Sequence, residues 1–472
     1  MTWGSFLSRS LSLVIVLPLI LTRLSTAEIA LWYLFTLIIN LQLLADIGFA
    51  PTFTRVIAYG MSGLTVKDIV QLNSGQTKSQ SNVSQHDNKN PNWSTIERIC
   101  SCMTFIYSML GVLSGLGLLI LGTFALIKPI SEIDSKIYAW AAWAVIIVTS
   151  IIIFMGNSYS SYLQGTNHIA VLRRWEILIS LGAIVTSFIV VYTGGGLLGL
   201  VISHQIWQLV NVIKNRWLCQ TIFSGKHSKF KYYGWDSEVF KIVWPSAWRS
   251  GLGVFMTYGL VQLSGVVYAQ FGGASSVASY LLGLRLIQLV SKFSQAPLYS
   301  KLPLLASLYA VMQFTKLTMI AQRGMRISYL VYASGFLILG IFATPILNAI
   351  NSNAEFPNSL LWFLLGIAIF IERYGAMHIQ LYSITNHIIW HIANSVAGIL
   401  YLVTSLYLFR LIGVYAFPLG LLVGYLCFYS WFSAKHSYST FGINFFKLES
   451  KTSLLPLLLV LGYGLFVIIE YV

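Results

Sequence analysis

Charged side chains are scarce in this sequence. Lys, Arg, Asp and Glu make up 9% of its 472 residues, whereas 57% are hydrophobic and the mean hydropathy is +0.75. A soluble domain carries roughly 25% charged residues. So few charges cannot shield so apolar a chain from water, so lipid must cover it. A soluble globular protein is therefore excluded.

The residues of common catalytic and metal sites are also missing. The four cysteines, Cys100, Cys102, Cys219 and Cys427, are too few and scattered for a disulfide framework or a zinc site, and we interpret them as small apolar fillers. No nucleotide-binding loop and no Gly-x-Ser-x-Gly motif occurs, and the pair His387 and His391 lacks a neighbouring acid. We therefore expect neither an enzyme nor a resident cofactor.

What the sequence has in abundance is long apolar runs. Each is close to the ~20 residues that a helix needs to cross a ~30 Å hydrocarbon core, and the ~10-residue alternation of a membrane β-barrel is absent. The runs predict an all-α, polytopic membrane helix bundle with twelve core spans, approximately 6–22, 29–50, 100–127, 138–158, 172–193, 196–213, 243–268, 277–297, 327–349, 359–382, 388–409 and 412–433. The run 453–469 is a possible thirteenth span. The first run resembles a signal peptide, but the next begins at Ile29, which favours a retained helix.

Lys and Arg residues predict the orientation. With the N-terminus in the cytoplasm, twenty of the 29 fall on the cytoplasmic side and only four on the outer side. This is the positive-inside pattern. It accounts for most of the +15 net charge without a nucleic-acid partner. The basic stretch Lys226–Lys231 is expected to meet anionic membrane lipids.

The same spans predict the domain organisation. An N-terminal six-helix lobe covers 1–214 and includes a polar cytoplasmic loop at 61–94; a basic cytoplasmic linker covers 215–242. A C-terminal six-helix lobe covers 243–435, and a tail with the possible extra span covers 436–472. No outer loop is long enough for a globular domain, so the bundle itself must carry the function.

A sequence repeat supports two lobes. Ala50–Arg55 and Ala296–Lys301 both read Ala-Pro-x-aromatic-hydroxyl-cation, at the ends of the second and eighth spans. Two further pairs keep a similar offset, Arg9 with Arg249 and Tyr33 with Tyr280. Because six spans are an even number, such halves would be parallel and would enclose a central cavity, as in alternating-access transporters. A helix-end signal common to both segments is the alternative.

Ionisable residues inside spans are costly and usually face a cavity or a partner. The deep ones are Asp46, Arg249, Arg285, Glu372 and Arg373. Each could instead belong to a structural ion pair between helices. Arginines outnumber acids here, and guanidinium groups bind phosphate bidentately. This balance favours an anionic substrate, for which a pyrophosphate-linked lipid is a natural membrane example, over a drug cation.

Two details refine this set. Gln288 and Lys292 follow Arg285 at helical spacing, which predicts one polar stripe on an apolar helix. Glu372 and Arg373 are adjacent and diverge by ~100° around a helix, so we expect that they cannot neutralise each other and that at least one faces the bundle interior.

The sequence resembles the polysaccharide-biosynthesis flippases (O-antigen or repeat-unit translocases) of the multidrug/oligosaccharidyl-lipid/polysaccharide exporter superfamily. The residues that carry the resemblance are Trp32–Phe35, Asp46–Phe49, Arg55–Ala58 with Gly60, and Tyr280–Lys301. The pattern extends over most of 1–435, and its motifs are degenerate. The loop 61–94 and the tail 453–469 depart from its simplest version.

The resemblance implies translocation of an undecaprenyl-pyrophosphate-linked oligosaccharide from the cytoplasmic to the outer leaflet of the inner (plasma) membrane. Arg285, Arg249 and Arg373, with Gln288 and Lys292, would bind the pyrophosphate or acidic sugars. Asp46 and Glu372 would serve in gating or in coupling to H⁺ or Na⁺. A polysaccharide polymerase and chain-length proteins would be partners.

Two alternatives remain. An ion-coupled multidrug antiporter of the same superfamily would be expected to have more buried acids than arginines. A membrane glycosyltransferase or polysaccharide polymerase would need a sizeable extramembrane loop with catalytic residues, and the predicted outer loops are too short for one.

Overall fold

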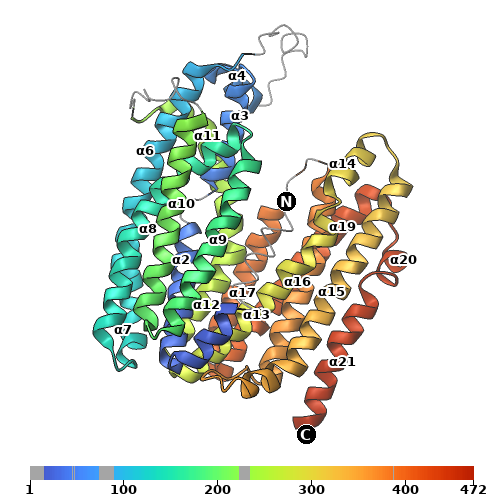
Figure 1. The fold of residues 1–472 in the computed structure, drawn as a ribbon. Helices are drawn as coiled ribbons and strands as arrows, with labels where there is room; N and C mark the ends of the chain where they lie inside the picture. The colour runs from blue at the N-terminus through green and yellow to red at the C-terminus, as the bar shows by residue number, and fades with distance from the viewer. Residues whose placement is uncertain are drawn as a thin grey trace. The chain divides into compact units, whose positions relative to one another are not determined.

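The computed structural model describes residues 15–44, 46, 48–73, 90–222, 234–385, 387 and 389–471. Over these ranges the chain is helical between short turns and contains no strand (Figure 1). The predicted all-α helix bundle is therefore confirmed. Arg9, Ile47 and the basic stretch Lys226–Lys231 lie outside the described residues.

The chain packs as two compact units, Met1–Leu252 and Gly253–Val472. In the first unit residues 15–23 are helical. They are followed by α2 (Thr26–Leu44), α3 (Phe49–Met61), α4 (Val66–Asn73), α6 (Trp93–Gly117), the π-helical turn η1 (Leu118–Gly122), α7 (Thr123–Ser131), α8 (Lys136–Gly165), α9 (Ile169–Tyr192), α10 (Gly196–Ile222) and α11 (Ser237–Val254), whose last two residues belong to the second unit.

The second unit continues with the π-helical turn η2 (Phe255–Gly259), α12 (Leu260–Tyr268), α13 (Ala274–Tyr299), α14 (Leu302–Ala310), α15 (Phe314–Ala349), α16 (Ser359–Ser383), α17 (Trp390–Ile412), the 3₁₀ turn η3 (Gly413–Tyr415), α18 (Ala416–Gly424), the π-helical turn η4 (Tyr425–Tyr429), α19 (Ser430–Phe441), α20 (Phe445–Glu449) and α21 (Leu454–Tyr471). Most of α16 is buried, so this helix lies at the centre of its unit.

Eight helical stretches in the described part of the chain are long and apolar enough to cross a membrane. One of them, Trp390–Phe441, was predicted as two spans. Gly413 at the end of α17 has a φ of +58°, a conformation that residues with a Cβ rarely adopt, and the chain reverses there so that α18 packs along α17. A single apolar stretch therefore supplies two packed helices.

The predicted second span, 29–50, is broken in the structure. α2 ends at Leu44 and α3 begins at Phe49, and Gly48 between them has a φ of +71°. A Cβ on Gly48 would lie 2.5 Å from the Cβ of Ser250 in α11, so this position has no room for a side chain. The periodicity of apolar residues continues across the break, which is why the sequence predicts one helix.

The two copies of the repeat motif differ in local structure. Pro51 lies in the first turn of α3, directly after the break, whereas Pro297 lies near the end of the uninterrupted helix α13. The repeat itself stays a prediction. In the predicted polar loop 61–94, residues 66–73 form α4, with Val66 and Ile69 buried in the core of the first unit.

The apolar tail forms α21, which packs against α15 and α16 of the second unit (Figure 1). Its 18 residues correspond to ~27 Å of helix, close to the thickness of a hydrocarbon core. α20 and a short turn connect it to α19. The tail is thus a packed part of its unit.

Candidate functional site

Asp46 lies in the break between α2 and α3. Its carboxylate accepts the backbone N–H of Ala50 at 3.2 Å and the hydroxyl of Tyr107 at 2.9 Å. Acidic side chains are favoured here because the first N–H groups of a helix have no partner within the helix and carry positive partial charge. Asp46 therefore fixes the start of α3 inside the first unit.

Other polar groups extend this site along the first unit. The Tyr107 hydroxyl lies 3.5 Å from that of Ser161 in α8. One turn before Asp46, Gln42 donates to the hydroxyl of Ser114 at 3.3 Å and to the carbonyl of Ser150 at 3.2 Å. Asp46 and Gln42 thus belong to a set of polar contacts that joins the α2–α3 break to α6 and α8.

Glu372 and Arg373 occupy the middle of α16 and are both buried. Arg373 donates from Nε to one carboxylate oxygen of Glu372 at 2.7 Å and from a terminal nitrogen to the other at 2.5 Å. The prediction that these neighbours cannot neutralise each other is wrong. The arginine side chain is long enough to turn back across the ~100° between the two positions and form a bidentate pair.

Tyrosines surround this ion pair. Five of them interact electrostatically with both of its members: Tyr258 of η2, Tyr299 of α13, Tyr332 of α15, and Tyr425 and Tyr429 of η4. Three of the five therefore lie in π-helical turns, which often occur at functional sites because they re-aim side chains. One terminal nitrogen of Arg373 is buried and has no hydrogen-bond partner among the described residues.

The remaining predicted substrate residues divide between the two units. Arg285, Gln288 and Lys292 follow one another along α13, the first two half-buried and Lys292 exposed. Arg249 lies exposed in α11 of the first unit. The structure thus pairs Glu372 with Arg373 and places Arg285 and Lys292 on one helix. The binding roles of these residues stay predictions.

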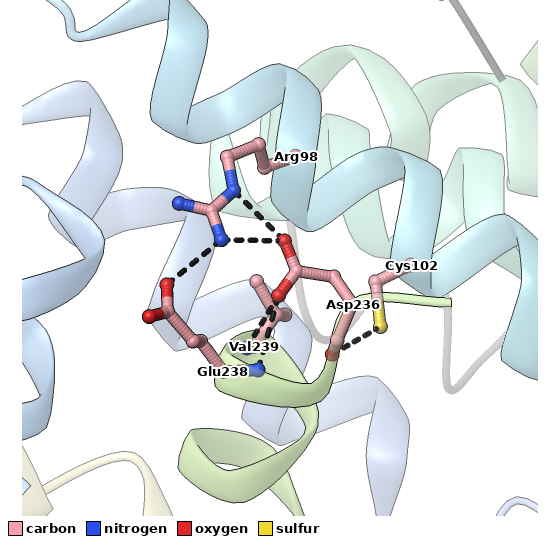
Figure 2. A network of polar contacts seen from close by, with 5 residues as sticks. All are labelled: Arg98, Cys102, Asp236, Glu238 and Val239. Carbon is pink, nitrogen blue, oxygen red and sulfur yellow. Dashed lines mark hydrogen bonds and ion pairs between the residues drawn. The ribbon is translucent and has the colours of Figure 1, made fainter. Parts of the chain in front are cut away.

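A charged network at the start of α11 was not predicted. Arg98 of α6 donates to Asp236 at 2.8 Å and to Glu238 at 2.9 Å, as Figure 2 shows. Asp236 also accepts the backbone N–H groups of Glu238 and Val239 at 3.0 and 3.2 Å, so it caps the helix. An Asp is a known helix start signal, but the predicted span begins only at 243, so Asp236 was not recognised as the cap of a helix that begins at Ser237.

A second network was also missed. His378 of α16 is fully buried, and its Nε2 lies 3.3 Å from a carboxylate oxygen of Glu449 in α20. In the sequence, Glu449 is the only acid between Glu372 and Glu470. A lone acid directly before an apolar run is a signal that could have identified it. No group of three or more metal-binding side chains occurs in the described ranges.

No protein-family model and no curated protein matches the sequence. Solved structures do share the fold. An inward-facing multidrug-resistance MATE-family transporter of the MOP superfamily is 11% identical, with a TM-score of 0.65 over 91% of this chain and 94% of its own. The lipid II flippase MurJ in an inward closed conformation is 13% identical, with a TM-score of 0.65 over 100% of this chain and 92% of its own.

A third similar structure is that of the MATE multidrug transporter DinF-BH, solved as a complex. It is 14% identical, with a TM-score of 0.61 over 94% of this chain and 96% of its own. At these identities the comparisons establish the fold. The chain is a multi-pass membrane protein that shares its architecture, over nearly its whole length, with MATE transporters and a lipid flippase.

Proposed function

We propose that this protein is an alternating-access transporter that moves an undecaprenyl-pyrophosphate-linked oligosaccharide from the cytoplasmic to the outer leaflet of the plasma membrane, for surface polysaccharide synthesis. The observation that carries the proposal is the similarity to the lipid II flippase MurJ over the entire chain, including the tail. No enzymatic step is required, because translocation of a lipid-linked glycan makes and breaks no covalent bond.

We assign recognition of an anionic substrate mainly to Arg285. Arg373 is paired with Glu372 and Arg249 is exposed in the first unit, so neither is the better candidate. Arg285 lies on α13 among apolar residues, on a stripe with Gln288 and Lys292. A guanidinium in this position suits a phosphate better than an ammonium does, because it can form two parallel hydrogen bonds.

A multidrug antiporter is the second candidate. The MATE transporter matches with the same TM-score as MurJ, 0.65. The half-buried Asp46, held by Tyr107 and the start of α3, is the acid that could bind a cation in such a protein. The two functions differ in the charge of their substrates, so one assay separates them.

Purified protein in liposomes tests the proposal. The probe is a fluorescent short-chain polyprenyl pyrophosphate carrying a disaccharide, and flipping is measured as protection from a membrane-impermeant reductant. We expect the wild-type protein to flip this probe. The same liposomes should not concentrate a cationic dye. Dye uptake without flipping of the pyrophosphate probe would support the antiporter instead.

Arg285 provides the residue-level test. Arg285→Ala should reduce flipping by about tenfold or more, because a hydrogen bond to a charged group contributes ~1.5–3 kcal/mol. Arg285→Lys should recover only part of the rate, since it keeps the charge but not the bidentate geometry. Arg410→Ala, at an exposed arginine in the last turn of α17, is the matched control and should flip normally. Full activity of Arg285→Ala at wild-type abundance would refute a role for Arg285 in substrate binding.

A further inference from the structure

Glu449 is a buried carboxylate at the end of α20, just before the tail helix α21. Three hydroxyl groups donate hydrogen bonds to it: Tyr438 at 2.5 Å, Thr452 at 3.2 Å, and Ser453. The side chain is 9% exposed. A carboxylate saturated with donors in this way is stabilised in its ionised form, but a buried ionised group also needs a positive partner.

His378 is the partner that the structure supplies. It is 0% exposed, its Nε2 lies 3.3 Å from the carboxylate of Glu449, and the rings of Tyr374 and Tyr438 lie against it at centroid distances of 4.8 and 5.0 Å. Both ring nitrogens are buried without a hydrogen-bond partner in the described part of the chain, so Nε2 lies at ion-pair distance from Glu449 but not in hydrogen-bond geometry. Imidazole is the side chain whose charge ordinarily changes between about pH 5 and pH 8.

The groups that face Glu449 come from every helix in electrostatic or hydrogen-bond contact with it. They are Tyr329 of α15, Tyr374 and His378 of α16, and Tyr438 of α19. Burial raises the pKa of Glu449, but its interactions with His378, Ser453 and Tyr438 more than offset this effect and hold the pKa below its usual value. Glu449 and His378 therefore share a buried site in which an ionised carboxylate lies within ion-pair distance of an imidazole.

A line of tyrosines connects this site to the Glu372–Arg373 pair. The hydroxyls of Tyr438 and Tyr374 lie 2.8 Å apart, and the ring of Tyr374 stacks on that of Tyr329 at 6.3 Å. Tyr329 interacts electrostatically with both Glu449 and Arg373. A change of charge at Glu449 or His378 would therefore change the electrostatic environment of the Glu372–Arg373 pair at the centre of α16.

We propose that His378 and Glu449 form a proton-binding site through which protonation of the second unit is coupled to transport. The inference rests on the proposed function and deepens it, because it names H⁺ as the coupling ion and makes the tail a working part of the transporter. A single proton is taken up or released by the pair, on the imidazole or on the carboxylate, and no bond other than N–H or O–H changes. A Na⁺ ion is disfavoured because it would have to displace the hydroxyl donors and the imidazole that already contact the carboxylate.

Transport in liposomes is the first test, with the fluorescent pyrophosphate probe and an imposed pH gradient or Na⁺ gradient. We expect a pH gradient to change the wild-type rate and a Na⁺ gradient to leave it unchanged. Glu449→Gln and His378→Gln should each lose the response to the pH gradient while their melting temperatures stay near that of the wild type. Glu449→Asp should restore part of the response. A wild-type response to Na⁺ alone would overturn the proposal.

The matched control is His436→Gln. His436 lies on α19, as Tyr438 does, but its Nδ1 contacts the backbone carbonyl of Phe432 at 2.8 Å, away from the hydrogen bonds of Glu449. This variant should keep the wild-type pH response. If Glu449→Gln and His378→Gln instead lower abundance and melting temperature, and the remaining protein still responds to pH, the pair only anchors the tail and the proposal is wrong.

A second measurement needs no substrate and so separates this proposal from the proposed function. Infrared difference spectra of the purified protein between about pH 5 and pH 8, where imidazole titrates, report protonation of buried carboxyl and imidazole groups. The wild type should show a signal that Glu449→Gln and His378→Gln both lack and that His436→Gln retains. If the wild type shows this signal but flips no probe, the lipid substrate is refuted and the proton site is not. Its absence from the wild type would refute the proton site.

Discussion

Glu372 and Arg373 show, at the scale of single residues, how a membrane helix tolerates charge. Each would be costly alone inside the bilayer. Together they form a bidentate pair within one helix, so α16 carries no net charge at this position. Because neither partner comes from another helix, the pair can move with α16 as a unit. Removing one member would leave the other as an unpaired charge among the surrounding tyrosines.

Replacing Arg373 by methionine should destabilise the protein strongly. It leaves Glu372 as an unpaired buried carboxylate, and breaking a buried pair in this way costs ~3–5 kcal/mol. We expect low abundance in membranes and a lower melting temperature in detergent. The double variant Arg373→Met with Glu372→Gln should recover most of the loss, because no charge remains buried.

The exposed Arg410 is again the control, and Arg410→Met should behave as the wild type. If the single and double variants are equally unstable, the carboxylate is not the cause, and Arg373 stabilises the fold through other contacts.

Apolar periodicity was enough to predict which of these residues are deep, but not how they are paired. Glu372 and Arg373 are buried as predicted, yet their mutual contact depends on a side-chain rotamer, which spacing along a helix does not determine. The partnership of His378 with Glu449 was missed for a different reason. It joins positions 71 residues apart, across a turn whose packing no local pattern reveals.

The start of α11 is the element whose position depends most visibly on charged contacts. Asp236 caps its first N–H groups, and Arg98 links it to α6 (Figure 2). The side chain of Asp236 is 16% exposed, whereas that of Glu238 is 55% exposed. We therefore expect the two acids to contribute unequally to the stability of the fold, although both pair with Arg98.

Asp236→Ala should cost ~1–2 kcal/mol, because it removes a helix cap and a shielded ion pair together. Glu238→Ala should cost less than ~0.5 kcal/mol, since an exposed pair is screened by water. Melting temperatures of the purified variants, with hydrogen exchange of residues 237–240, measure both effects. Equal losses would show that the cap contributes nothing beyond the ion pairs.

At the scale of elements, the sequence predicted the helices well and their interruptions poorly. Long apolar runs correspond to α8, α9, α10, α13, α15 and α16. The break at Gly48 and the helix α4 were not predicted. Both depend on local geometry within the first unit: Gly48 lies against Ser250, and Val66 and Ile69 of α4 are buried in its core.

The whole molecule consists of two compact units, of which the second carries an additional apolar helix at its C-terminal end. This helix bears on topology. Lys447 and Lys451 precede α21, and the positive-inside pattern puts them in the cytoplasm. If α21 crosses the bilayer, as its ~27 Å length and its contacts with α15 and α16 favour, the C-terminus lies outside.

Reporter fusions test this arrangement. A reporter fused after Ser453 should score cytoplasmic, and one fused after Val472 should score external, because only the second fusion contains α21. A fusion after Gly273, between α12 and α13, is the external control and should score with the second. If both C-terminal fusions score cytoplasmic while the Gly273 fusion scores external, α21 lies along the membrane surface. An apolar helix that packs on α15 and α16 has no extended polar face to present to water there, so we expect the crossing.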